Sequence, residues 1–512
     1  MKLFGFEFGR RSEPSPQKND MLVAARNRYK QLSAKYDAAI NSSEHDRHWA
    51  NADYLSPAAA ADPEIRRKLR SRARYELQEN SSLGKGICLK KSKDVVGTCP
   101  RLQVDLASIS RASSTGTVRD DNRMVEVEFN RWARAVKLGN KLRTMYFQFQ
   151  CDGESFAVES SNRFLPSPVK LDLALYEGDQ VTTPYLSGKP NEIDGITFDR
   201  HGQPRNYTLL KSHPGGNSYI IGDETMSVRA HSMIHLFRED RPGQRRGIPH
   251  VTPALPLFAF RRRFLLATIA AAEIAADHAG VLQTKSGAFD SSENTFDAGV
   301  QVDDIFDIDR GMLTALPYGW EMKQMAAEHP TSTIEMFDKC LVAEMARCMQ
   351  MPFNRAAGNS SGFTFASGKL DRDDYLETIE VEQFDLGTSV LDRVFHWWVR
   401  EAAFATGVLP IGLSEQLRNG LLKPGTISKS WHFDRKRETD PSKQANADVT
   451  YWNAGLLPDD IFFQRIGIDP DDAYQKLGTM MERRMDVGAP LPGRQQIPSA
   501  IDEYGESEDA DD

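Results

Sequence analysis

The chain has 512 residues, of which 40% are apolar and 27% charged, and its formal net charge is −8. That length predicts about three domains of 100–200 residues each, and the composition is that of a globular protein with a sizeable core. Residues 502–512 hold seven acids and no base, which leaves −1 of the −8 for the rest of the chain. The near-neutral charge of residues 1–501 excludes a protein that coats nucleic acid through a strongly basic surface. The acids of residues 502–512 predict a disordered, solvated tail.

Cysteine usage and hydropathy exclude two further classes of protein. Five cysteines lie without any Cys-x-x-Cys pair, which predicts free thiols in a reducing compartment. The most apolar window, residues 264–280, contains Glu273, Asp277 and His278 and is shorter than a membrane span requires. We therefore expect neither a disulfide framework nor a membrane-spanning helix.

The first strong helical pattern covers residues 63–79. Apolar residues recur every four positions on one face, namely Ile65, Leu69, Ala73 and Leu77, and six bases cover the other faces. We interpret the basic faces as ion-paired or solvated, with phosphate contact as the alternative. Short runs that alternate between apolar and polar residues follow, separated by turns and including residues 97–105. A helix is then expected over residues 125–136.

Residues 147–237 alternate between apolar and polar positions and are punctuated by turn pairs, which predicts β-structure. Within this region His231 and His235 have a spacing found among zinc ligands. No acid or third ligand lies close to them in the sequence. We therefore predict no metal site there.

A long helix is expected over residues 252–280, about 40 Å in length. Residues 281–330 form a separate acidic module, in which Asp307-x-Asp309 departs from the pattern of a calcium loop. Another helix is expected from Ser332, with a buried stripe of Ile334, Phe337, Leu341, Met345 and Cys348. A longer one follows over residues 369–405, weakened and kinked at Gly387, and short helices occupy residues 440–484.

The stretch PFNRAAGNSSGFTFASGKL, residues 352–370, resembles two kinds of catalytic motif. A phosphate-binding loop is excluded, because five residues separate its glycines and no hydroxyl follows Lys369. A serine hydrolase would use Ser360 within Gly-x-Ser-x-Gly, followed by Asp392 and His396. The segment follows a helix and a proline rather than a buried strand. Asp392 and His396, one turn apart on one helix, are more simply interpreted as a salt-bridged pair.

Four stretches in this order resemble the lambda-type phage portal protein family, and the match covers most of the chain. They are LRSRARYE (69–76) with Asn80 and VVGT (95–98), HLF (235–237) with RPGQRRGIP (241–249), residues 352–370 with the helix after them, and Asp440-Pro441 with Lys443 and NAGL (453–456). The second stretch is the most specific. Where the family has Tyr-Ser-Ser followed by Arg, this chain has FASGK (365–369), which keeps a basic residue but not bidentate phosphate contact.

The resemblance implies an α+β, mainly helical portal-type subunit that assembles, in twelve copies, into a ring at one capsid vertex. Its parts would be a wing (1–250), two stem helices (251–280 and 331–353), a clip between them (281–330), a tunnel loop (354–366), a long wing helix (367–406), a crown (407–500) and the acidic tail (501–512). DNA would enter through the ring during packaging and leave through it during ejection. Such a protein is found in the virion, and in the host cytoplasm during assembly.

The same resemblance implies partners and site residues. The partners are the terminase large subunit, then a head-tail adaptor, the major capsid and scaffolding proteins, and double-stranded DNA without sequence specificity. We expect the clip acids to take part in docking, namely Asp303, Asp304, Asp307 and Asp309. The DNA channel would be lined by Asn354, Arg355, Asn359, Ser360, Ser361, Phe363 and Lys369. Phe363 and Phe365 would anchor the loop to the following helix. No catalytic residue, cofactor or metal is expected.

Physical reasoning from the residues agrees with a DNA channel. Each neutralised phosphate adds counterion-release free energy, so a lumen rich in cations would hold DNA still. One arginine per loop gives weak contact without sequence readout. Two other classes stay open: a serine hydrolase using residues 358–362, and a sequence-specific DNA-binding protein using residues 68–74 or 238–246.

Overall fold

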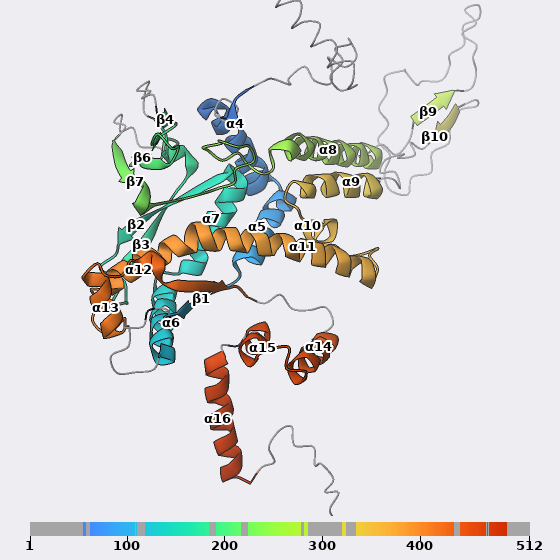
Figure 1. Ribbon diagram of the computed structural model, residues 1–512. Helices are drawn as coiled ribbons and strands as arrows, with labels where there is room; N and C mark the ends of the chain where they lie inside the picture. The colour runs from blue at the N-terminus through green and yellow to red at the C-terminus, as the bar shows by residue number, and fades with distance from the viewer. Residues whose placement is uncertain are drawn as a thin grey trace, which may run out of the picture. The chain divides into compact units, whose positions relative to one another are not determined.

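The computed structural model describes residues 55–57, 62–107, 109, 118–183, 191–216, 224–277, 281–284, 320–323, 334–434, 441–466, 468 and 470–488. The chain divides into two units, Met1–Ala60 and Ala61–Asp512, and the helices and strands named below belong to the second. The clip acids and the acidic tail lie outside the described residues. The predicted class, α+β and mainly helical, is confirmed (Figure 1).

The first described part of this unit is helical. Its elements are α4 (Pro63–Arg74), a π-helical turn η2 (Tyr75–Asn80), α5 (Ser82–Val96), α6 (Val118–Ala135) and α7 (Leu138–Asp152). Asp62 caps α4 by accepting from the amide of Glu64 at 2.9 Å, with Pro63 in the first turn. Ser81 caps α5 in the same way through the amide of Gly84, at 3.1 Å.

Two antiparallel sheets follow. The first has the order β3-β2-β8, with β2 (Glu154–Ser161) between β3 (Leu171–Tyr176) and β8 (Met233–Phe237). The second has the order β4-β5-β6-β7, from β4 (Glu192–Ile193), β5 (Ile196–Phe198), β6 (Pro204–Leu210) and β7 (Thr225–Arg229). Elsewhere β1 (Arg101–Asp105) pairs with β11 (Ser428–His432), and β9 (Val281–Thr284) with β10 (Trp320–Lys323). Single 3-10 turns occupy η3 (Gly178–Gln180), η4 (Ala230–Ser232), η5 (Thr252–Ala254) and η7 (Pro424–Thr426).

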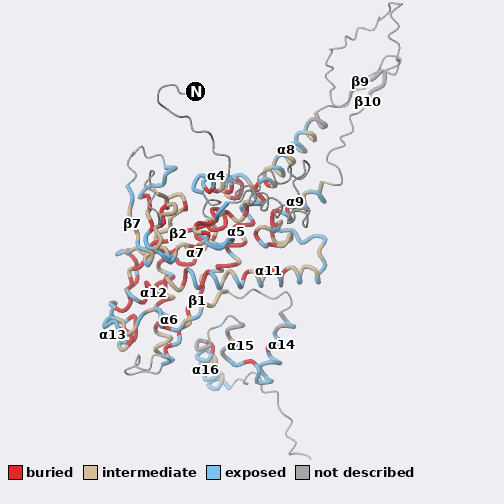
Figure 2. Tube along the Cα trace, turned by 45° about the horizontal axis from the view of Figure 1, so that its top comes forward, coloured by how far each residue is buried: buried red, intermediate tan, exposed pale blue. Residues whose placement is uncertain are grey.

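The remaining elements are helices. They are α8 (Leu255–Asp277), α9 (Ile334–Arg347), α10 (Phe353–Ala357), α11 (Phe365–Leu386), the π-helical turn η6 (Gly387–Leu391), α12 (Asp392–Ala402), α13 (Ile411–Arg418), α14 (Pro441–Asn453), α15 (Asp459–Ile466) and α16 (Pro470–Asp486). Helix α8 is about 35 Å long at 1.5 Å per residue. It lies beside α9 (Figures 1 and 2), where Arg261 binds Asp338 and the ring centroids of Phe264 and Phe337 are 5.1 Å apart.

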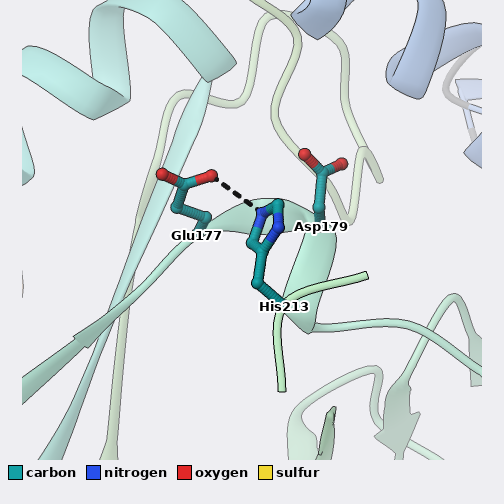
Figure 3. Close-up of side chains that lie close together, drawn as sticks. All are labelled: Glu177, Asp179 and His213. Carbon is teal, nitrogen blue, oxygen red and sulfur yellow. Dashed lines mark hydrogen bonds and ion pairs between the residues drawn. The ribbon is translucent and has the colours of Figure 1, made fainter. Parts of the chain in front are cut away.

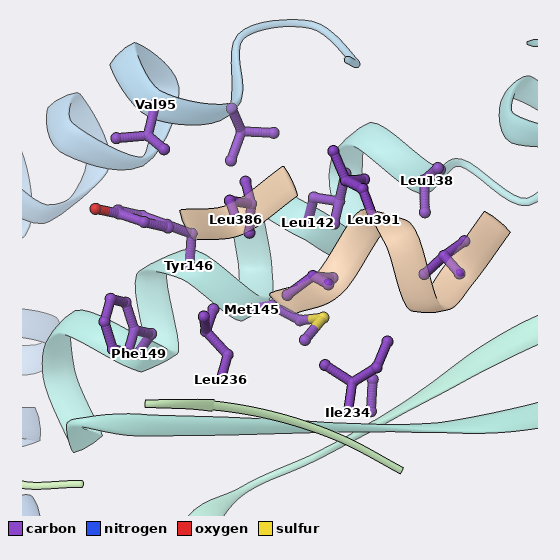
Figure 4. Packing of buried hydrophobic residues seen from close by; sticks show 14 of the residues in the cluster. Val95, Leu138, Leu142, Met145, Tyr146, Phe149, Ile234, Leu236, Leu386 and Leu391 are labelled. Atoms are coloured by element: carbon purple, nitrogen blue, oxygen red, sulfur yellow. The ribbon is translucent and has the colours of Figure 1, made fainter. Parts of the chain in front are cut away.

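The main core joins α5, α6 and α7 to the β3-β2-β8 sheet and to the continuous helical rod formed by α11, η6 and α12. Figure 4 shows the side chains that meet there, from Val95 on α5 and Tyr146 on α7 to Ile234 on β8 and Leu386 on α11. The indole of Trp132 donates to the carbonyl oxygen of Leu171 at 2.9 Å, which satisfies its polar atom inside the core. Figure 2 shows how the buried residues gather in this part of the molecule.

Several sequence expectations are confirmed. The helix at the predicted position of 252–280 is present as η5 and α8, and the helix over 125–136 is present as the second part of α6, which ends at Ala135. At Gly387, where a kink was expected, the structure has the π-helical turn η6, in the middle of the long rod. A π-turn inserts one residue into the helical repeat, which is a recognised way to interrupt a long helix.

Other expectations were wrong. Residues 147–152 belong to helix α7 and not to a strand, because the buried positions Leu138, Leu142, Met145 and Phe149 recur at steps of three and four. Helix α5 occupies residues 82–96, in a region expected to hold short alternating runs. Phe337, expected to be buried, is exposed.

Candidate functional site

The segment expected to be a tunnel loop connects two helices, and the connection is shorter than expected. Helix α10 contains the first four of its residues and α11 begins at Phe365, so the loop itself covers residues 358–364. Gly358 and Gly362 have φ angles of 65° and 82°, in the left-handed region that other residues rarely adopt. A Cβ atom at either position would meet no atom within 4 Å. The need for glycine is therefore conformational and not a matter of space.

Short-range hydrogen bonds shape the loop. The amide of Ser361 donates to Oδ1 of Asn359 at 2.9 Å, which forms a tight turn. Thr364 caps α11: its Oγ1 accepts from the amide of Ser367 at 3.3 Å, and Oγ of Ser367 accepts from the amide of Thr364 at 3.1 Å. Ser360, the expected nucleophile of the hydrolase interpretation, is exposed.

One aromatic side chain attaches the loop to the protein. The rings of Phe363 and Phe353 stack at an interplanar angle of 13°, with centroids 6.2 Å apart. Phe365 is 64% exposed at the start of α11. The expectation that both phenylalanines anchor the loop to the following helix was therefore wrong, because Phe363 packs on the preceding helix, α10.

A cavity of about 920 Å³ lies beside the loop. No acidic side chain is among its described lining residues, and its cations come from four helices: Lys90, Arg261, Arg355, Lys369 and Arg372. Asp338 neutralises Arg261 at 2.7 Å, and Asp94 lies 3.3 Å from Lys90. Among the described residues, no acid forms an ion pair with Arg355 or Lys369.

This arrangement suits an anionic group. Cations that lack a protein counter-charge raise the local positive potential and attract anions such as phosphate diesters. Contacts of that kind position a nucleic acid but carry no sequence information. Arg355 and Lys369 were expected from the sequence, whereas the other three cations were missed. Lys90 could not be found from sequence alone, since it lies more than 260 residues before the loop, whereas Arg372 is one turn beyond Lys369.

The hydrolase interpretation is not supported by the geometry. Ser360 lines the cavity beside the loop, whereas Asp392 and His396 line a different one, of about 710 Å³, against β-strand residues. Asp392 accepts from the indole nitrogen of Trp431 at 2.9 Å and lies 3.5 Å from Lys429. The expectation of a salt bridge between Asp392 and His396 was therefore wrong, and the three side chains of the supposed triad are not brought together.

One arginine from each of the first two family-like stretches, together with His235 of the second, converges on one buried carboxylate, that of Glu154 at the start of β2. Arg246 donates to it from Nε at 2.8 Å and from Nη2 at 2.6 Å, Arg70 donates at 3.1 Å, and the ring of His235 lies 3.2 Å away. Burial alone would raise the pKa of Glu154, but Arg246 and His235 hold it well below its ordinary value. The group therefore stays ionised inside the protein.

A second part of this ion network surrounds Arg74. Its guanidinium contacts Asp152 at 2.5 Å, Glu177 at 3.0 Å and Asp179 at 2.7 Å. Figure 3 shows Glu177 and Asp179 beside His213, a grouping of oxygen and nitrogen atoms that could in principle hold a cation. Arg74 already supplies positive charge at the carboxylates of Glu177 and Asp179, so the grouping is better explained as part of the ion network.

These contacts decide between the two interpretations of the basic stretches. Arg70, Arg74 and Arg246 are directed into the fold and paired with carboxylates, and Arg67 and Arg72 of helix α4 are exposed, in agreement with ion-paired or solvated basic faces. These three arginines are thus not presented to the edges of bases, as sequence-specific recognition requires. His235 is engaged with Glu154 and stacks on Phe156 at 4.3 Å between centroids, in place of any role as a zinc ligand.

In the described part of the chain, no helix combines the length and apolar character that crossing a membrane would need.

The chain is similar to several known proteins. The sequence model of the family described as "Phage portal protein, lambda family" matches residues 45–383. A "Probable portal protein" of Halomonas phage phiHAP-1 is 26% identical over 446 residues, which cover 83% of this chain and 82% of that protein. Among solved structures, the neck of a native gene transfer agent particle computed with C12 symmetry is similar at a TM-score of 0.43 and 13% identity, over 80% of this chain and 95% of that one. The neck of an empty particle computed with C6 symmetry gives 0.41 and 13%, over 82% and 93%. The family match spans well over half of the sequence, and the chain therefore belongs to the lambda family of phage portal proteins.

Proposed function

We propose that twelve copies of this chain close into a ring at one vertex of a phage capsid, and that double-stranded DNA passes through the ring during packaging and ejection. The observation that supports the channel is the cavity beside residues 358–364, which has Arg355 and Lys369 on its wall and no acid among its described lining residues. Its charge suits a phosphate backbone, and contacts to phosphates carry no sequence information. The role is therefore passage of DNA without sequence preference.

Weak contact is a requirement of such a channel. The affinity for DNA grows with each phosphate that is neutralised, because counterions are released. Arg261 and Lys90 already have acidic partners inside the subunit, which lowers the charge they offer to DNA. Two cations per subunit are left without a described counter-charge. The glycines at 358 and 362 allow the loop backbone to adjust as successive phosphates pass.

The remaining partners follow from family membership. Residues 281–330 would form the clip, which docks the terminase large subunit during packaging and the head-tail adaptor afterwards. Within that segment the structure describes the antiparallel pair β9–β10. The acids Asp303, Asp304, Asp307 and Asp309 would contribute to docking by electrostatic attraction, which mainly affects association rate and its salt dependence. Major capsid and scaffolding proteins would contact the outside of the ring during assembly.

Deleting residues 359–362 tests the role of the loop. Because α10, α11 and the core are built from other residues, rings and assembled shells should form as in the wild type. The amount of DNA retained per particle, measured as nuclease-protected DNA, should fall.

Ser360→Ala is the matched control, and it should leave packaging unchanged since no nucleophile is involved. The proposal fails if the deletion packages and retains DNA normally. A hydrolytic activity abolished by Ser360→Ala would also contradict it and would favour the hydrolase.

A further inference from the structure

Three consecutive arginines near the start of α8 have three different environments. Arg261 binds Asp338 of α9 at 2.7 Å and 3.0 Å. Arg262 contacts Glu76 of η2 at 2.5 Å, and its guanidinium lies 5.0 Å from the ring centre of Tyr75. Arg263 is exposed, and among the described residues no acid forms an ion pair with it. The first two fix α8 to its own subunit, while the third points away from it.

Apolar side chains surround Arg263 on the same side of α8. Phe260 is 57% exposed and Leu266 is 61% exposed, at three residues before and after Arg263, and Ala270 follows one turn later. Residues three and four apart share a helix face. We call these four residues the α8 outward face. It is apolar, and it carries one cation.

Helix α11 has a face of complementary composition. Its buried side carries Arg372, Tyr375 and Ile379. The opposite side, which we call the α11 outward face, consists of Leu370, Asp373, Asp374, Glu377, Glu380, Val381 and Phe384. Its apolar members are 71%, 62% and 71% exposed, in chain order. Among the described residues, no base forms an ion pair with its four acids.

We propose that the α11 outward face of one subunit packs against the α8 outward face of the next, with Arg263 among the acids around Glu377. The inference rests on the proposed ring. A ring of identical subunits needs two different surfaces that fit each other head to tail. The two faces provide this fit, because each exposes large apolar side chains and their charges are opposite. Interfaces of this kind bury apolar side chains at the centre and keep charged ones at the rim.

A charge exchange tests the contact. Arg263→Glu and Glu377→Arg each place like charges together, so each should raise the protein concentration at which half of the subunits are in rings by about tenfold. The two substitutions combined restore opposite charges and should bring that concentration back to within about threefold of the wild type. Ring fraction can be measured by mass photometry over a dilution series.

The matched control exchanges the exposed pair Lys211 and Glu224, which are 2.8 Å apart across β6 and β7. Lys211→Glu with Glu224→Lys should leave assembly unchanged. Fluorescence of the buried Trp132 and Trp398 checks that each variant is folded, since all the exchanged residues are exposed.

Cross-linking provides an independent test. The variant would carry Arg263→Cys and Glu377→Cys together with Cys340→Ser, because Cys340 on α9 is the one native thiol that is exposed among the described cysteines. Mild oxidation with copper phenanthroline should give a ladder of multimers on a non-reducing gel. Variants with one introduced cysteine should give no ladder.

The outcomes separate this inference from the proposed function. Restoration by the double exchange together with the ladder supports the contact. The contact is overturned if both single reversals assemble like the wild type, or if rings of the double-cysteine variant give no ladder. The ring would then stand, and the two faces would serve another partner such as a capsid protein. A wild type that forms no rings overturns the proposed function itself.

Discussion

The substitution Glu154→Gln tests whether the buried ion network holds the subunit together. Glu154 is fully buried and accepts hydrogen bonds from Arg246, Arg70 and the amide of Gly247 at 2.6–3.1 Å. Glutamine keeps the size of the side chain but removes the charge and turns one acceptor into a donor. Removing one partner of a buried ion pair costs about 3–5 kcal/mol. We expect a loss of stability in that range, because several arginines are left without their shared acid.

The same reasoning gives a pH dependence. The pKa of Glu154 is raised by burial but lowered further by Arg246 and His235, so that it lies well below its ordinary value. A carboxylate with a lowered pKa in the folded state stabilises the protein above its unfolded pKa of about 4.3. That stabilisation is lost as the pH falls from about 4.3 towards the folded pKa. The stabilities of wild type and variant should therefore converge in acid and differ most at neutral pH.

Urea unfolding followed by the fluorescence of Trp132 and Trp398 measures the effect, since both indoles are buried in the core. Glu159→Gln is the matched control on the same strand, β2, where the carboxylate pairs with the half-exposed Arg400. Its cost should stay within about 1 kcal/mol. A Glu154→Gln variant as stable as the Glu159→Gln control would refute the reasoning.

Three further predictions concern the surface of the subunit. Truncation of residues 501–512 removes charge but little apolar surface, so rings should form normally in electron micrographs; monomers would show that the tail takes part in assembly. Asp303→Lys with Asp304→Lys should weaken terminase binding at low salt and leave rings intact, and unchanged binding would mean that terminase docks elsewhere. Arg355→Ala with Lys369→Ala should weaken duplex binding and lower the slope of log K against log salt by about 0.9 for each phosphate that the variant no longer neutralises. An unchanged slope, measured by fluorescence anisotropy, would show that these cations do not meet DNA.

The sequence predicted well those features that depend on local patterns. Helices α8, α9 and the α11–η6–α12 rod have periodic apolar residues, and Gly387 indicated where the rod becomes irregular. Residues 147–152 were wrongly predicted as a strand, because Phe-Gln-Phe-Gln alternates like one although it lies on a helix. Only the longer window that begins at Leu138 contains the helical repeat.

Features that depend on long-range contacts could not be predicted. Arg70 and Arg246 lie 84 and 92 residues from Glu154 in the sequence, and nothing near Glu154 indicates that it is the centre of an ion network. Lys90 joins the cavity through the packing of α5 against α10. Phe337 fits the periodic stripe of α9, yet it is 48% exposed. Helical periodicity identifies apolar positions, but it does not say whether the same chain or another one covers them.

Electron microscopy of the purified full-length protein tests the central claim most directly. A portal protein with the proposed function should form closed rings with a central hole, and class averages viewed along the axis should show twelve repeats. Particles that stay monomeric at concentrations well above those needed for ring assembly, or that form compact oligomers without a channel, would contradict the account.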